Sequence, residues 1–244
     1  MAKPSLIPPP IVPKGEFTRY RILSKDSRDP LGSMTQRVSR VSEDGKECYR
    51  LDITSESRDG DVIEESFVLQ IVDVLKPLSY RVNIKNRKGE VTVESEMTCS
   101  ELQLPPNSAH ISATDFCLRG VAFTPKRKVA FNTITSEGTV VRMNGGVSSK
   151  KEKVKVPAGE FQCSKIDLTP DMTSLMEATG VNVPLPGLGA LMKQFTSTFH
   201  YWFSVDEPHY LIKHESFIID PIQGKQVILE LTNVEDAGRQ ETSA

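Results

Sequence analysis

Glycine-centred turns recur at short intervals between segments of alternating apolar and polar residues, and they constrain the fold more than any other feature. Asp-Gly pairs in such a setting are strong signals of tight β-hairpin loops. The pattern therefore predicts a meander of antiparallel strands rather than helices. The turns are Glu43-Asp44-Gly45-Lys46, Arg58-Asp59-Gly60-Asp61 and Asn86-Arg87-Lys88-Gly89.

The same alternation continues to the end of the chain and predicts an all-β protein with minor α content. Pro157-Ala158-Gly159 is expected to turn one hairpin, and Gly145-Gly146 to form a bulge or turn between two strands. The segment 109–118 is ambiguous, because Ser112 to Asp115 is suited to capping a short helix. Predicted strands cover residues 17–22, 33–42, 48–57, 62–72, 79–85, 90–95, 128–135, 138–145, 151–156, 160–168, 196–204, 210–219 and 226–233.

One excursion interrupts the strands. The segment 169–179 has helical apolar spacing, begins with Thr169-Pro170-Asp171 and is stopped by Gly180. The apolar stretch 172–192 is expected to cover the open end of the sheet, either as a lid over a ligand or as a plug that completes the core. Its candidate ligand-binding residues are Met172, Met176, Leu188 and Met192.

The expected architecture is a single strongly curved antiparallel sheet, an open or half barrel around this helical excursion. Three parts are expected: a proline-rich arm at 1–15, one domain at 16–234 and a polar tail at 235–244. The composition of the arm is typical of a disordered leader, with wrapping of the domain or binding of a partner as alternatives.

Charge and cysteine content limit the partners and the cellular locations that we expect for the protein. With 30 basic and 32 acidic residues among 244, the chain lacks the basic excess typical of nucleic-acid binding, so no nucleic acid is expected. The lysine-rich run 150–155 is expected on a solvated hairpin. No secretion signal is expected, because prolines break every early apolar run, and no membrane span is expected, because no stretch reaches about 18 apolar residues. The widely spaced Cys48, Cys99, Cys117 and Cys163 predict reduced thiols and a cytoplasmic location.

The richest stretch for chemistry is 195–217, which holds three of the four histidines and the single tryptophan. Alternation puts Phe199, Tyr201 and Phe203 on one strand face. Such a hairpin suits a pocket with aromatic walls and a few polar groups; a packed hairpin with cross-strand aromatic pairs is the alternative. The catalytic candidates are His200, Lys213, His214 and Glu215, and the ligand-binding candidates are Phe199, Tyr201, Trp202, Phe203 and Tyr210.

Cofactor chemistry is not expected. His209 and His214 lie five residues apart with no third ligand at metal-binding spacing, so no metal site is predicted. The chain has neither a Gly-x-Ser-x-Gly elbow nor a glycine-rich phosphate loop before a helix.

Several segments occur in a characteristic order from about residue 15 to 232. The segments are Gly15–Ile22, Leu31–Met34, Asp73–Tyr80, Val156–Ile166, Tyr201–Ser204 and Pro208–Glu215. As a set they resemble a bacterial β-protein family of unknown function. The resemblance implies an incomplete barrel wrapped about a helix, similar to the lipoprotein carriers LolA and LolB, which hold acyl chains, and to the cofactor-independent enzyme VioE. Many relatives carry a secretion signal; the sequence as given has none, which favours cytoplasmic roles.

Three functions follow as hypotheses. The first is binding of a hydrophobic or amphipathic small molecule, lipid-like or natural-product-like, in the concave face. The second is a cofactor-independent isomerase or cyclase of a biosynthetic pathway that uses the same pocket. The third is a structural or partner-binding module with an unknown protein partner. A buried carboxylate or histidine facing the cavity favours catalysis, and an apolar interior favours binding. The sequence leaves open whether the protein is an enzyme.

Overall fold

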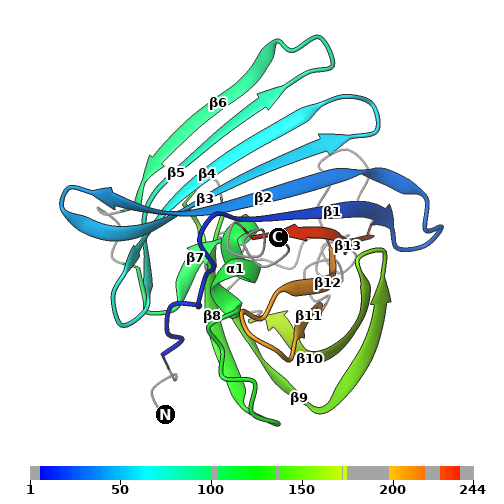
Figure 1. Ribbon diagram of the computed structural model, residues 1–244. Coiled ribbons are helices and arrows are strands. Elements are labelled where there is room, and N and C mark those ends of the chain that lie inside the picture. The colour runs from blue at the N-terminus through cyan, green and yellow to red at the C-terminus, as the bar shows by residue number, and fades with distance from the viewer. Residues whose placement is uncertain are drawn as a thin grey trace, which may run out of the picture.

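A computed structural model describes residues 6–99, 104–135, 138–171, 173–174, 198–217 and 226–236. The strands in these residues form one sheet in the order β6-β5-β4-β3-β2-β1-β13-β12-β11-β10-β9-β8-β7. The sheet curves around the short helix α1 (Thr114–Leu118), and its end strands β6 and β7 do not pair with each other (Figure 1). The expected open, curved antiparallel sheet is confirmed; the β7–β8 pair alone is parallel among the described strands.

The N-terminal strands run as a meander and the C-terminal strands as a second one, and β1 pairs with β13 to join them. Their bounds are β1 Glu16–Ser24, β2 Pro30–Glu43, β3 Lys46–Ser57, β4 Val62–Ile71, β5 Leu75–Lys85, β6 Val91–Thr98, β7 Ser108–His110, β8 Lys128–Ile134, β9 Val140–Val156, β10 Gly159–Pro170, β11 Phe199–Ser204, β12 Leu211–Phe217 and β13 Gln226–Glu235.

The predicted glycine turns close the hairpins. Asp44 and Gly45, with φ of 51° and 74°, join β2 to β3, as a two-residue loop with two left-handed residues requires. Gly60 and Gly89, with φ of 90° and 80°, lie in the turns after β3 and β5. These turns explain why the hairpin register of the first half follows from local sequence.

The prediction for Gly145 and Gly146 was wrong. Both lie inside β9, a single strand where the sequence predicted two. A Cβ on Gly145 would stand 1.7 Å from the backbone oxygen of Asp167, and one on Gly146 would stand 2.8 Å from that of Arg127. Close approach of neighbouring backbones therefore requires these glycines.

The helix enclosed by the described sheet comes from the ambiguous segment. A 3-10 turn at Ile111–Ala113 leads into α1. Of the expected helix of 169–179, the structure describes residues 169–171, 173 and 174, and only Thr173 and Ser174 are helical among them. Their backbone amides donate to Asp171 Oδ1 over 3.1 and 3.3 Å, the pattern of an N-cap. Thr169 and Pro170 end β10 instead of starting the helix.

The described part of the proline arm lies against the domain. The amide of Ile7 donates to Asn107 Oδ1 over 2.9 Å, and the Tyr49 hydroxyl donates to the carbonyl of Pro10 over 3.1 Å. Gly120 lacks the Cβ that would stand 1.8 Å from the Pro8 carbonyl oxygen. Residues 6–15 therefore wrap the domain rather than extend from it.

We call the face of the sheet that packs on α1 the inner face, and the opposite face the outer face. The inner face of β3 buries Tyr49, Leu51 and Ile53, and the Tyr49 ring meets the Phe116 ring of α1 edge-on at 5.6 Å. This contact places the main apolar core between the sheet and α1. All four cysteines are buried free thiols. No described helix is long and apolar enough to cross a membrane.

A buried ion pair fixes α1 to the sheet. Arg119, directly after α1, donates to both carboxylate oxygens of Glu16 on β1, over 2.6 and 2.9 Å. Its guanidinium also donates to the carbonyl of Pro208, in the β11–β12 turn. The side chains of Arg119 and Glu16 are 5% and 2% exposed. One side chain thus connects three distant segments.

Candidate functional site

The aromatic hairpin β11–β12 divides its predicted site residues between the two faces. Tyr201 and His214 are cross-strand neighbours on the inner face, and their rings stack at 4.1 Å. Phe203 stacks on Tyr201, and Phe199 lies 6.5 Å from the His214 ring. Alternation puts His200, Trp202, Lys213 and Glu215 on the outer face. The predicted residues therefore do not form one site.

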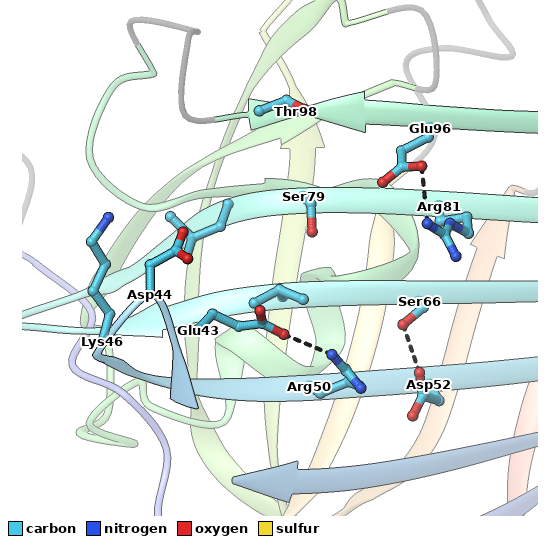
Figure 2. A pocket seen from close by; sticks show the side chains of 12 residues that line it. Glu43, Asp44, Lys46, Arg50, Asp52, Ser66, Ser79, Arg81, Glu96 and Thr98 are labelled. Atoms are coloured by element: carbon cyan, nitrogen blue, oxygen red, sulfur yellow. Dashed lines mark hydrogen bonds and ion pairs between the residues drawn. The ribbon is translucent and has the colours of Figure 1, made fainter. Parts of the chain in front are cut away.

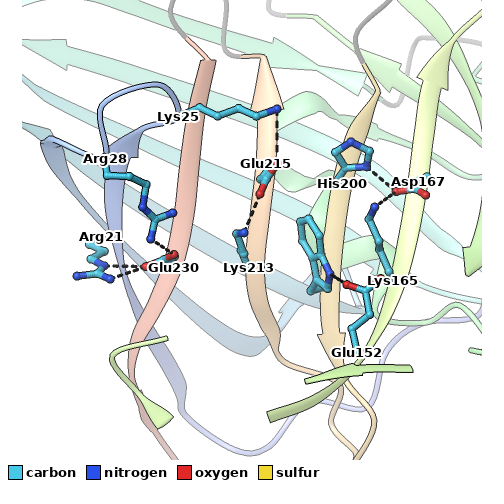
Figure 3. Close-up of polar contacts among 11 residues, drawn as sticks. Arg21, Lys25, Arg28, Glu152, Lys165, Asp167, His200, Lys213, Glu215 and Glu230 are labelled. Carbon is cyan, nitrogen blue, oxygen red and sulfur yellow. Dashed lines mark hydrogen bonds and ion pairs between the residues drawn. The ribbon is translucent and has the colours of Figure 1, made fainter. Parts of the chain in front are cut away.

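On the outer face, Trp202 pairs across the sheet with Lys165 and Lys213, the two lysines labelled in Figure 3. Lys165 Nζ is 5.0 Å and Lys213 Nζ 4.8 Å from the ring centroid, and the indole Nε1 donates to Glu152 over 2.8 Å. Glu215 contacts Lys213 at 2.7 Å. Burial raises the pKa of Glu215, but the lysines outweigh it and hold that pKa below its usual range. This ladder of paired charges stabilises the sheet.

The ladder continues at both ends. His200 Nδ1 lies 2.5 Å from Asp167 Oδ1, and Lys165 reaches the same carboxylate oxygen at 3.1 Å. At the other end, Glu230 on β13 accepts from Arg21 and Arg28 (Figure 3). His200 is a partly exposed imidazole that the Asp167 carboxylate orients. Such an imidazole is suited to proton transfer with a bound substrate.

His214 is different because it lies on the inner face. Its Nε2 is buried and has no hydrogen-bond partner among the described residues. Burial, reinforced by His200, lowers the pKa of His214 to about 3 against a smaller opposite effect of Glu215. The ring is therefore a neutral imidazole at pH 7, and one of its buried nitrogens has no partner in the described part of the chain.

Tyr210 is a neighbour of the buried Arg119–Glu16 ion pair rather than part of the aromatic β11–β12 hairpin. Its hydroxyl donates to Asp236 Oδ2 over 2.6 Å, and the guanidinium of Arg119 lies 5.3 Å from its ring centroid. Met172, Met176, Leu188 and Met192 lie outside the described residues. Within the described ranges, no group of three His, Cys, Asp or Glu side chains is placed to hold a metal ion.

The inner face carries a polar cluster that the sequence did not reveal. Glu65 on β4 accepts from the Ser112 hydroxyl at 2.9 Å and from the Tyr80 hydroxyl at 3.3 Å. Gln36 on β2 donates to Asp115 Oδ2 over 2.9 Å. We call these five residues the inner polar cluster. Burial raises the pKa of Glu65 and of Asp115, although their hydrogen bonds act in the opposite direction.

Aromatic rings flank this cluster. The Tyr80 ring stacks on Phe67 at 5.0 Å and on His110 at 4.0 Å. Asp115 also acts electrostatically on Tyr201, where burial and this charge raise the tyrosine pKa. Asp115 therefore lies near Tyr201, which brings one carboxyl of the cluster close to the Tyr201–His214 stack.

Apolar side chains lie next to the cluster, towards the β5–β6 hairpin. Ile63, two residues before Glu65, is 38% exposed, and Val93 and Val91 on β6 are 45% and 55% exposed. Register pairs Ile63 with Ile84 and Ile84 with Val93, so they share the inner face. We call Ile63, Ile84 and Val93 the apolar rim, without Val91, which pairs with the outer-face Lys85 beyond a register shift. An alternation signal was present in the sequence: Glu65 occupies an inner position between Ile63 and Phe67.

A hollow of about 550 Å³ lies on the outer face of β2–β6 (Figure 2). Two ion pairs lie in its lining: Arg50 with Glu43 at 2.7 Å and Arg81 with Glu96 at 3.0 Å. Its lining is Glu43, Asp44, Lys46, Arg50, Asp52, Ser66, Val68, Leu78, Ser79, Arg81, Glu96 and Thr98. A hollow this polar does not suit a hydrophobic ligand.

Comparison with known proteins identifies the fold and nothing finer. No family model matches the chain, and no curated protein matches it. A β-barrel-like protein of domain of unknown function DUF1849 from Brucella abortus is similar in structure, with a TM-score of 0.50 and 10% identity over 95% of this chain and 99% of that one. The chain thus has a bacterial β-barrel-like fold found in proteins of unknown function.

Two further solved structures are similar to the chain. One is an exported-protein candidate with a YmcC-like fold from Bacteroides fragilis, with a TM-score of 0.38 and 11% identity over 95% of this chain and 100% of that one. The other is a lipoprotein candidate from Parabacteroides distasonis, with a TM-score of 0.44 and 9% identity over 96% of this chain and 100% of that one.

Proposed function

We propose that the protein binds an amphipathic small molecule, lipid-like or natural-product-like, on the inner face of the curved sheet, in the manner of LolA and LolB. One observation carries the proposal: the apolar rim stays partly exposed directly beside the inner polar cluster. Exposed apolar side chains next to a few convergent polar groups are typical of small-molecule sites. The apolar part of the ligand would lie on the rim and its polar group at Glu65.

The test compares two equally exposed valines. Val93 is on the rim at 45% exposure, and Val72 follows β4 at 47% exposure. We expect Val93→Asp to abolish binding of the neutral fluorescent probe N-phenyl-1-naphthylamine, because a charge on the rim opposes an apolar ligand. Val72→Asp should bind as the wild type does. Equal effects of the two substitutions would contradict the proposal.

A cofactor-independent enzyme, similar to VioE, is the second candidate. It is supported by the two carboxyls of raised pKa and the neutral His214 on the same face, since such groups suit proton transfer. Mass spectrometry of molecules that co-purify from the native host separates the two. A compound returned unchanged after incubation supports binding, and a converted one supports catalysis.

A structural or partner-binding role is the third. It would gain support if native mass spectrometry shows no retained molecule and the probe does not bind. We further propose a cytoplasmic location, supported by the four buried free thiols.

A further inference from the structure

We infer that the ligand of the inner face is a cationic amphiphile, whose ammonium group is received by Glu65 and its neighbours. This inference rests on the proposed function and names the chemical class of its ligand. Three observations carry it: two carboxyls that form no ion pair with a described residue, an acceptor that has no described donor, and the apolar rim next to Glu65.

Two of the carboxyls on the inner face form no ion pair within the described residues, although the Arg119 charge acts on Asp115 from a distance. Glu65 and Asp115 are hydrogen-bonded only by neutral groups, and neither forms an ion pair with any described residue. The inner-face arginines are already engaged: Arg119 with Glu16, and Arg40 with Glu47. Burial disfavours the charged form of these carboxyls, and a positive ligand group would stabilise that form.

The buried nitrogen of His214 is the independent sign of a missing partner. Its Nε2 has no hydrogen bond within the described part of the chain, although buried polar atoms are almost always bonded. An imidazole whose other nitrogen carries the proton accepts through this atom. Carboxylate oxygens and this nitrogen are all acceptors, whereas an ammonium is a donor only.

The surroundings of Glu65 suit an ammonium with an apolar chain. Along the inner face of β4, the partly exposed Ile63 comes first, then Glu65, then the buried Phe67. A ligand carboxylate would meet acceptors and negative charge, and would be rejected.

The test uses ligands of one chain length: decylamine, decanol and decanoate, measured by calorimetry at pH 7 below their micelle concentrations. We expect decylamine to bind at least about tenfold more tightly than decanol, because a charge-assisted hydrogen bond is gained. Decanoate should bind more weakly than decanol. Equal binding of amine and alcohol, or preferred binding of decanoate, overturns the inference while the proposed function stands. Failure of all three to bind defeats the proposed function itself.

Adjacent glutamates provide the matched variants. Glu65→Gln keeps an acceptor for Ser112 and should reduce the preference for the amine over the alcohol to below about threefold. Glu64→Gln changes the neighbouring outer-face residue, whose carboxylate contacts Lys85 at 2.7 Å, and should keep the full preference. If Glu65→Gln retains the wild-type preference, the ammonium is not received at Glu65. The order in which decylamine, decanol and decanoate bind to the wild-type protein decides the inference even if a variant folds poorly.

Discussion

Replacing Arg119 with Met tests the buried ion pair that holds α1 against β1. The substitution keeps an apolar stem but removes the cation from Glu16, whose side chain is 2% exposed. It also removes two donors from the carbonyl of Pro208. Glu16 would remain as an uncompensated buried charge, which is the costly outcome for such pairs.

The size of the expected loss of stability follows from the burial of both Arg119 and Glu16. Removing one member of a buried ion pair typically costs about 3–5 kcal/mol, and the lost Pro208 contacts place Arg119→Met near the upper end. The pair Arg40–Glu47 is the control, because its members are 62% and 59% exposed. Arg40→Met should therefore cost less than about 1 kcal/mol.

Urea unfolding followed by circular dichroism measures both values. The double variant Glu16→Leu with Arg119→Met should recover at least half of the loss, because an apolar pair leaves no buried charge behind. The reasoning is refuted if Arg119→Met costs no more than Arg40→Met, or if the double variant loses the sum of the two single losses.

Three further predictions concern single positions. Gly145→Ala should cost at least about 2 kcal/mol in urea unfolding, because the new methyl meets the Asp167 carbonyl oxygen, which cannot move aside. Trp202→Phe removes the indole N–H that donates to Glu152 and should lower the free energy of unfolding by about 1–2 kcal/mol. An unchanged midpoint of urea unfolding would show that the ladder of paired charges on the outer face contributes little to stability. Burial raises the folded-state pKa of Glu65, so the free energy of unfolding of the ligand-free protein falls as pH rises from the unfolded-state pKa through the folded one. Glu65→Gln should therefore unfold at a higher temperature than the wild type at pH 7, with the difference vanishing near about pH 3.5, where the carboxyl is protonated in both states.

Much of the fold could be predicted because its signals are local. The Asp44-Gly45 turn requires left-handed residues, and the alternation around Tyr49 and Leu51 fixes which residues share a face. Gly145 shows the limit. The reason for that glycine is the backbone of Asp167 on the neighbouring strand, a contact that no local pattern contains.

The candidate site was less predictable, for a related reason. Alternation correctly separated Lys213 and Glu215 from His214, but a single strand does not show which face meets the helix. The inner polar cluster is assembled from β2, β4, β5 and the segment around α1, which are far apart in sequence. Its one local sign was Glu65, a charged residue at an inner position of its strand.

The pairing of β1 with β13 has a consequence for synthesis. Arg21 and Glu230 meet across this pairing although they lie 209 residues apart. The first meander leaves the ribosome with β1 as an unpaired edge, and β13 is made after the other described strands. Until then, the β1 edge is open to pairing with another chain. The nascent protein is thus most vulnerable to aggregation just before its sheet is joined.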